Sequence, residues 1–175
     1  MPRQATLPRP RGESSPVKFT VIAVGKLKER FWKDACAEYV KRLQPYARTV
    51  VREIADIDPA KNGGVEAARE KEGEAICHAL DGLGQATHVV LLAIDGTERS
   101  SEGLSHRIDS LTLRGTSDFA FVIGGSDGVS DGVRDRADET LSFGPITLPH
   151  NLARVVLLEQ LYRAQKISHG EPYHK

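Results

Sequence analysis

Long apolar runs are absent from this sequence, and no stretch approaches the roughly 18 consecutive apolar residues that a membrane-spanning helix needs. The first sixteen residues are basic and rich in proline, and they lack the apolar segment of a secretory signal. We therefore expect a cytoplasmic protein without a membrane partner. We also expect residues 1–16 to be a disordered N-terminal extension.

Cysteine is scarce as well. The two cysteines, Cys36 and Cys77, both fall within helix-type patterns, and neither a C-x-x-C motif nor another metal-ligand spacing occurs. The sequence therefore gives no basis for a disulfide framework. We expect two reduced residues that pack in the core, and no metal site.

An excess of either charge is also missing, since 24 Lys and Arg residues balance 24 Asp and Glu residues. The charges are nevertheless unevenly distributed: residues 1–52 hold 12 basic and 4 acidic side chains, whereas residues 53–140 hold 8 and 18. A basic N-terminal third is consistent with a surface that faces phosphate groups, although charged runs are most often simply solvated. Composition alone does not indicate a nucleic-acid enzyme.

What the sequence does contain is a regular alternation of strand-type and helix-type segments, over a length suited to one domain. This alternation is typical of the α/β class, with a mainly parallel sheet flanked by helices. We expect a single domain over residues 17–175. The expected strands are 17–24, 50–57, 88–94, 118–123 and a short one within 140–148. The expected helices are 31–43, 65–80, 101–113, 130–138 and a final one from about residue 151 to 169.

The final helix is the most strongly marked element. Asn151 is a favourable N-cap residue, and Gly170 followed by Pro172 is typical of a helix end. Apolar residues lie on more than one face of this helix, which predicts that part of it is buried against a second copy of the chain. These residues are Val155, Val156, Leu157, Leu158 and Leu161.

Three loops follow expected strands, at residues 93–97, 123–128 and 143–150. Open α/β sheets bind their ligands beyond the carboxyl ends of such strands. The G-G-S-D-G segment is neither a P-loop nor a dinucleotide-binding motif, so its residues alone favour a tight strand-to-helix turn. Residues 143–148 offer backbone groups and apolar side chains that suit an adenine ring, but they also suit a simple proline-stiffened connection.

Four separated motifs occur in order: V-I-A-V-G-K-L-K-E-R-F-W at 21–32, S-S-E-G-L at 100–104, D-F-A-F-V-I-G-G-S-D-G at 118–128, and a C-terminal signature. The signature comprises T-L-P-H, R-V-V-L-L-E-Q-L-Y-R-A and the terminal G-E-P-Y-H-K. From about residue 17 to the end, the chain resembles the bacterial 23S rRNA pseudouridine-N3-methyltransferases of the knotted SPOUT class.

The resemblance implies a C-terminal trefoil knot that binds S-adenosylmethionine, the methyl donor, without a metal. It also implies a homodimer that methylates N3 of a pseudouridine in 23S rRNA within the ribosome. A sulfonium is a good leaving group, so such an enzyme mainly has to align the sulfur, the methyl group and N3. The cofactor-binding residues implied by the resemblance are Leu92, Gly124, Gly125, Phe143, Gly144, Pro145, Ile146, Thr147 and Leu148.

The resemblance further implies that the last helix and the tail carry the catalytic residues, Tyr162, Arg163, His174 and Lys175. Arg163 or Lys175 would stabilise the anionic base, and His174 would take the proton from N3. On the residues alone, Arg163 would be half of an ordinary i,i+4 ion pair and Tyr162 a core residue. The tail alone would equally fit a segment that is ordered by packing.

The implied substrate contacts are His150, Arg154 and Tyr173, and Tyr173 would stack on a base that is splayed out of its loop. Two other functions stay open. A related knotted methyltransferase acting on tRNA or on a ribose 2′-hydroxyl would share the pocket, but we do not expect it to share the Y-H-K terminus. A non-catalytic ribosome-binding factor would keep a basic face and need no cofactor.

Overall fold

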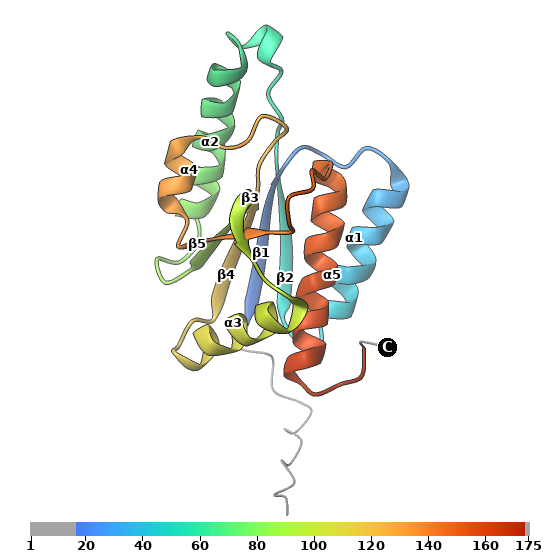
Figure 1. Ribbon diagram of the computed structural model, residues 1–175. Helices are drawn as coiled ribbons and strands as arrows, with labels where there is room; N and C mark the ends of the chain where they lie inside the picture. Colours follow the sequence, from blue (N-terminus) through green and yellow to red (C-terminus); the bar gives the residue numbers. More distant parts are fainter. Residues whose placement is uncertain (1–16, 174–175) are drawn as a thin grey trace, which may run out of the picture.

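The computed structural model describes residues 17–173 of the chain, so the predicted N-terminal extension and the two last residues, His174 and Lys175, lie outside it. Five strands form one parallel sheet in the order β2-β1-β4-β3-β5 (Figure 1). The predicted α/β class is therefore confirmed. The strands are β1 (Lys18–Val24), β2 (Arg48–Ile54), β3 (His88–Glu98), β4 (Asp118–Ile123) and β5 (Glu139–Ser142).

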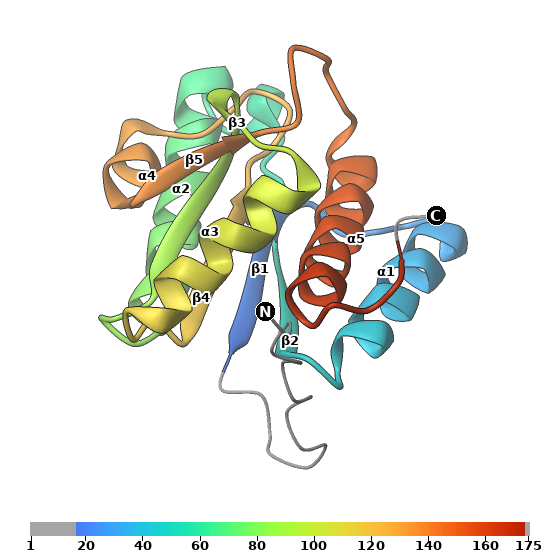
Figure 2. The same ribbon diagram turned by 60° about the horizontal axis from the view of Figure 1, so that its bottom comes forward.

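Helices cover both faces of the sheet (Figures 1 and 2). One face carries α1 (Arg30–Leu43), α3 (Ser101–Leu113) and α5 (His150–Ser168), with α5 packed between the other two. The other face carries α2 (Val65–Asp81) and α4 (Asp131–Arg136), and a short 3₁₀ helix at Pro59–Lys61 precedes α2.

The two central strands, β1 and β4, are apolar and buried on both faces. Such continuous apolarity is expected where helices cover both sides of a parallel sheet. On the face of α1, α3 and α5, the ring of Phe19 meets the rings of Phe119 and Phe121 edge-on, at 5.9 Å in each case. These aromatic contacts fix β1 and β4 side by side under α5.

Helix α5 buries three of the five apolar residues that were predicted to lie on several faces. Leu157, Leu158 and Leu161 are completely buried in the core of the chain itself. Val155 packs partly against the same core, and Val156 is also half-buried. The part of α5 that remains for a second copy of the chain is therefore narrower than the sequence pattern indicated.

Most element boundaries agree with the sequence to within a few residues, with two informative exceptions. The predicted cap at Asn151 is wrong, because the N-cap is Pro149 and Asn151 lies within the first turn of α5. Strand β3 continues to Glu98 because its ladder with β5 resumes at Thr97, after an irregular stretch that begins beyond Leu92. Gly170 has a φ of +65°, as expected of a residue just after a helix end.

The segment between β5 and α5 crosses from the edge of the sheet to its middle. Strand β5 is at the sheet edge beside β3, whereas α5 lies between α1 and α3 (Figures 1 and 2). Residues 143–149 therefore pass over the carboxyl ends of the strands. The fold thus gathers the connections after β3, β4 and β5 at one edge of the sheet.

Candidate active site

Three neighbouring strands, β4, β3 and β5, run to this edge. The predicted loops at 123–128 and 143–150 follow β4 and β5, but the predicted loop at 93–97 is wrong, because these residues form the irregular stretch within β3. Parallel strands present their carboxyl ends on the same side, which is where open α/β sheets bind ligands. Two exposed apolar side chains stand at this edge: Ile94, in the irregular stretch of β3, is 59% exposed, and Ile146, in the segment after β5, is 61% exposed. Exposed apolar groups on two neighbouring segments suit the faces of a planar ring.

A cavity of about 350 Å³ opens between the end of β5, the start of α3 and the middle of α5. Its volume lies within the range of small-molecule sites. Ser101 Oγ donates a hydrogen bond of 2.6 Å to Gln160 Oε1 and thereby links two of its walls. Of the predicted cofactor-binding residues, Phe143 and Gly144 line this cavity and the others do not.

The glycines of the β4 loop are required by close packing. A Cβ atom at Gly124 would lie 2.5 Å from Val129 Cγ1, and one at Gly125 would lie 2.9 Å from Glu72 Oε2. The loop closes on itself, since the N–H of Gly128 donates to the carbonyl of Gly125 at 3.1 Å. Glu72 is on α2, and the sequence analysis missed it because nothing local connects it with this loop.

The loop after β5 is tied to the irregular stretch of β3 by one hydroxyl group, that of Ser142. Ser142 Oγ donates to the carbonyl of Ile94 at 3.0 Å and accepts from the N–H of Gly144 at 3.1 Å. Beyond it, Pro145 and Thr147 are exposed and Leu148 is half-buried, while Leu92 packs partly against the core. The sequence analysis also missed Ser142.

Arg154 lies inside the protein at the carboxyl end of β1. It is 1% exposed, its Nη2 donates to the carbonyl of Gly25 at 2.8 Å, and its Nη1 lies 3.7 Å from Glu53 Oε1. Burial lowers the pKa of the Arg154 guanidinium, and the charge of Glu53 opposes that shift. This placement favours a positioning role over the predicted contact with substrate.

His150 lies beside Gly25, the residue that follows β1. A Cβ atom at Gly25 would come within 2.9 Å of His150 Nε2, and Gly25 has a φ of +95°. A glycine is therefore needed at residue 25 both for its backbone conformation and for the imidazole next to it. Arg154 and Gly25 together hold the first turn of α5 against β1, and this fixes the half-buried His150 at the carboxyl edge.

The predicted catalytic residues of α5 lie in an aromatic and cationic cluster. Tyr162 meets Tyr173 edge-on at 4.8 Å, and the guanidinium of Arg163 stacks over the Tyr173 ring at 4.5 Å. Arg163 also donates two hydrogen bonds to Glu159 Oε1, and these raise the pKa of its guanidinium. Burial raises the pKa of the Tyr173 phenol.

Two tyrosines that no local signal in the sequence marks complete this cluster: Tyr39 on α1 and Tyr46 in the turn after it. Tyr39 and Tyr46 contact the ring of Tyr162 at 6.4 and 6.1 Å. Tyr46 also donates its hydroxyl proton to Glu171 Oε2 at 2.8 Å and meets the ring of His169 edge-on. The C-terminal segment is therefore anchored, as far as Tyr173, on α1 and the turn that follows it.

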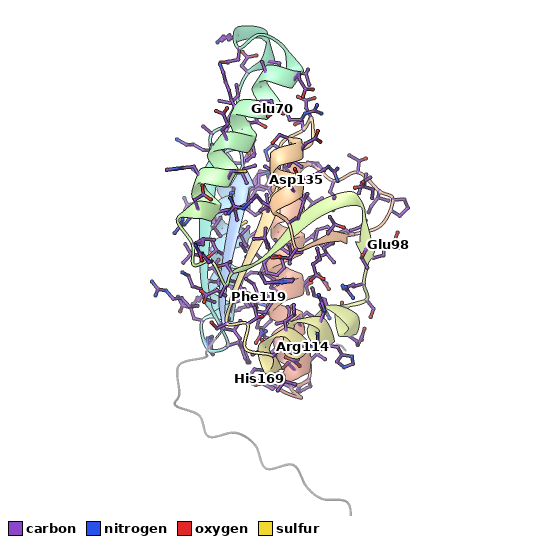
Figure 3. All side chains as sticks on the ribbon, turned by 90° about the vertical axis from the view of Figure 1, so that its left-hand side faces the viewer. Glu70, Glu98, Arg114, Phe119, Asp135 and His169 are labelled. Carbon is purple, nitrogen blue, oxygen red and sulfur yellow. The ribbon has the colours of Figure 1, made fainter. Side chains whose placement is uncertain are left out.

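The two parts of the predicted site are separated along α5. His150 is its first residue, and Tyr162 and Arg163 follow 12 and 13 positions later, which is about 20 Å along the helix. Figure 3 shows His169 at the lower end of the molecule, whereas the first turn of α5 is at the upper end in Figure 1. The structure thus groups Tyr162, Arg163 and Tyr173 together, and separately places His150 beside Gly25 and the strand ends.

Two further observations concern residues 17–173. Within that range, no three His, Cys, Asp or Glu side chains are grouped so that they could hold a metal ion. None of the helices described there is long and apolar enough to cross a membrane.

Residues 17–174 match the profile of a family described as "Predicted SPOUT methyltransferase". The chain belongs to the SPOUT methyltransferase family. Two curated relatives named "Ribosomal RNA large subunit methyltransferase H", from Bacillus cytotoxicus and Bacillus anthracis, are each 47% identical over 162 residues, which cover 91% of this chain and 100% of each relative.

A solved structure shows the same fold. It is described as a probable methylase family protein from Haemophilus influenzae Rd KW20 and superposes with a TM-score of 0.50 at 11% identity. The match covers 92% of this chain and 71% of that one. The family resemblance and the sheet flanked by helices, both expected from the sequence, are thus confirmed.

Proposed function

We propose that this protein transfers a methyl group from S-adenosylmethionine to N3 of a pseudouridine in the 23S rRNA of the large ribosomal subunit. The main support for the proposal is a sequence match to proteins named as large-subunit rRNA methyltransferases. The match covers the entire length of each of these relatives. The carboxyl edge of the sheet supports it, because the loops after β4 and β5 and the irregular stretch of β3 offer the backbone and apolar groups that a nucleoside cofactor needs.

The residues at this edge fit the cofactor. The tightly packed glycine loop at Gly124 and Gly125 presents backbone groups, and Ile94 and Ile146 present apolar surface. We propose that these residues, together with Leu92 and residues 143–148, hold S-adenosylmethionine. When bound, the cofactor supplies an activated methyl group on a sulfonium leaving group.

The chain's own side chains would prepare the base for methylation. N3 of the pyrimidine carries a proton that must leave, and His174 would accept it. Arg163 and Lys175 would stabilise the negative charge that develops on the ring, while Tyr162 would hold Arg163 and Tyr173 in place. Tyr173 would stack on the base, and His150 would contact the RNA beside the pocket.

The separation along α5 leads to a proposal about assembly. Since Arg163, on which Tyr173 stacks, lies about 20 Å along the helix from His150, we propose a homodimer in which the tail of one protomer serves the strand-end loops of the other. Val156 and its neighbours on the outer side of α5 would form part of the contact. We also propose that residues 143–149 are threaded as the trefoil knot of the SPOUT class.

The function is tested with ribosomal particles from a strain that lacks the corresponding enzyme. Purified protein with S-adenosylmethionine should add one methyl group to a pseudouridine of 23S rRNA, located by mass spectrometry of the digested RNA. Methylation of tRNA or of a ribose instead would overturn the proposed target. Failure to bind S-adenosylmethionine in calorimetry would contradict the proposed methyltransferase activity. A monomer mass in light scattering would contradict the proposed homodimer.

A further inference from the structure

Four exposed cations lie close in sequence to an exposed aromatic ring at the start of α1. The Lys26–Lys33 patch consists of Lys26, Lys28, Arg30, Phe31 and Lys33, and the side chains of all five are exposed. Phe31 is 62% exposed and leans on the half-buried Trp32, with the ring centroids 4.9 Å apart. A single exposed apolar side chain is common on protein surfaces, so it is the combination of this ring with the neighbouring cations that points to a partner.

Most of the positive charge in the patch is not neutralised. Arg30 pairs with Asp34 at 3.5 Å, but both side chains are largely solvated, so the pair is weak. The side chains of Lys26, Lys28 and Lys33 form no ion pair within residues 17–173. Two acidic residues lie beside the patch, the exposed N-cap Glu29 and Asp34, so the four cations keep an excess of positive charge.

The patch is held rigidly at the edge of the sheet that carries the strand-end loops. It begins immediately after Gly25, which accepts a hydrogen bond from Arg154 and lies against His150. Two residues later, the N–H of Leu27 donates to Glu53 Oε2 at 3.2 Å. Figure 1 shows the start of α1 at the same end of the molecule as the start of α5.

The charge of the patch decides which partner it fits. In a twofold dimer formed through this surface, the same cations would face one another, and that arrangement is repulsive. A single-stranded segment of RNA offers phosphates to the lysines and unpaired bases to the aromatic ring. We propose that the Lys26–Lys33 patch docks the RNA substrate, with Lys26, Lys28 and Lys33 on phosphates and Phe31 stacked on an unpaired base.

This inference rests on the proposed function, and its test separates the two. The variants are Phe31→Ala and the double variant Lys28→Gln/Lys33→Gln. The matched control is Leu113→Ala/Arg114→Gln at the end of α3, because Leu113 is 84% exposed and Arg114 is exposed as well. Figure 3 shows Arg114 at the lower end of the molecule, away from the start of α1 in Figure 1.

Binding of large ribosomal subunits is measured without cofactor at several salt concentrations, and methylation is measured separately. Phe31→Ala should weaken RNA binding about tenfold, as expected for the loss of one stacked base. Lys28→Gln/Lys33→Gln should reduce the slope of log affinity against log salt by about 2, one for each lost phosphate contact. Affinity for S-adenosylmethionine and kcat at saturating RNA should stay within about twofold of wild type, and the control variant should match wild type throughout.

Unchanged RNA affinity and salt slope in both patch variants would overturn the inference even if the wild-type protein methylates rRNA. A patch variant that becomes monomeric in light scattering would also overturn it, and would identify the patch as a subunit interface. A wild-type protein that binds subunits through the patch but methylates nothing would instead contradict the proposed function alone.

Discussion

The carboxylate of Glu72, on α2, lies against the backbone of Gly125 in the loop after β4. A Cβ atom at Gly125 would come within 2.9 Å of Glu72 Oε2 and 3.3 Å of a methyl carbon of Val24. The other carboxylate oxygen accepts a hydrogen bond of 2.9 Å from the N–H of Ile57, so the side chain cannot move away without breaking it. The shape of the glycine loop is thus held by a residue of another element.

Gly125→Ala should therefore weaken S-adenosylmethionine binding by about tenfold or more, because the new methyl group displaces either Glu72 or the loop. Calorimetry gives the affinity, and thermal unfolding shows whether the fold is intact. In the double variant with Glu72→Ala, part of the affinity should return, since the two changes meet at one contact. Gly132→Ala is the control: its Cβ would meet nothing closer than 3.9 Å, and affinity should not change.

Arg154→Ala should reduce the free energy of unfolding by about 3 kcal/mol, because it opens a buried space and removes the donor from the Gly25 carbonyl. Chemical denaturation measures the loss. Arg163→Ala, at a more exposed position on the same helix, should cost clearly less. If Arg154→Ala were as stable as wild type but bound RNA poorly, a direct substrate contact would replace the positioning role.

Shortening the chain tests the tail. A protein that ends at Tyr173 keeps the ring that packs on Tyr162 and Arg163, so its melting temperature and cofactor affinity should stay close to wild type. Its methylation rate should fall by about 100-fold or more, because proton transfer and charge stabilisation are both lost. An equal loss of stability and activity would instead indicate a tail that only packs.

His174→Ala isolates the proton acceptor from the rest of the tail. If His174 takes the proton from N3, the rate deficit of this variant should shrink as pH rises, because the imide then ionises without help. Rates at saturating RNA between about pH 7 and 9.5 provide the measurement. A deficit that is the same at every pH would assign His174 to contact or packing and leave Arg163 and Lys175 as the stabilising cations.

The order of strands and helices could be predicted because each element is marked by residues within or next to its own segment. Continuous apolar runs mark β1 and β4, and Gly170 with Pro172 marks the end of α5. The loops after β4 and β5 could be predicted for the same reason, since parallel strands place their carboxyl ends at one edge. The predicted loop at 93–97 is instead part of β3. The irregular stretch of β3 after Leu92 depends on its pairing with β5 and left no local signal.

The contacts that define the site were harder to predict because they join distant residues. Arg154 and Gly25 are 129 positions apart, and Tyr46 and Glu171 are 125 positions apart. An arginine in a helix resembles a surface residue until its partner is known, and the family resemblance implied a substrate contact for Arg154. Its burial depends on the positive φ of Gly25 and on Glu53, which the pattern of α5 does not contain.

The anchor of the C-terminal segment should be sensitive to acid. Tyr46 and Lys166 both bond to Glu171 Oε2, and these bonds, first that of Lys166, hold the pKa of Glu171 below its ordinary value of 4.5. A carboxyl group whose pKa is lowered by folding stabilises the protein above its ordinary pKa, and this contribution is lost as pH falls through the folded value.

Wild-type protein should therefore melt about 1–3 °C above Glu171→Gln at pH 7, a small difference because the site is partly solvated. The difference should stay constant down to about pH 4.5 and close below it, because Glu171 then becomes neutral like glutamine. Tyr46→Phe removes one of the two bonds and should show a smaller shift over the same range. A difference that persists unchanged below pH 3 would mean that the packing of Glu171, rather than its charge, anchors the segment.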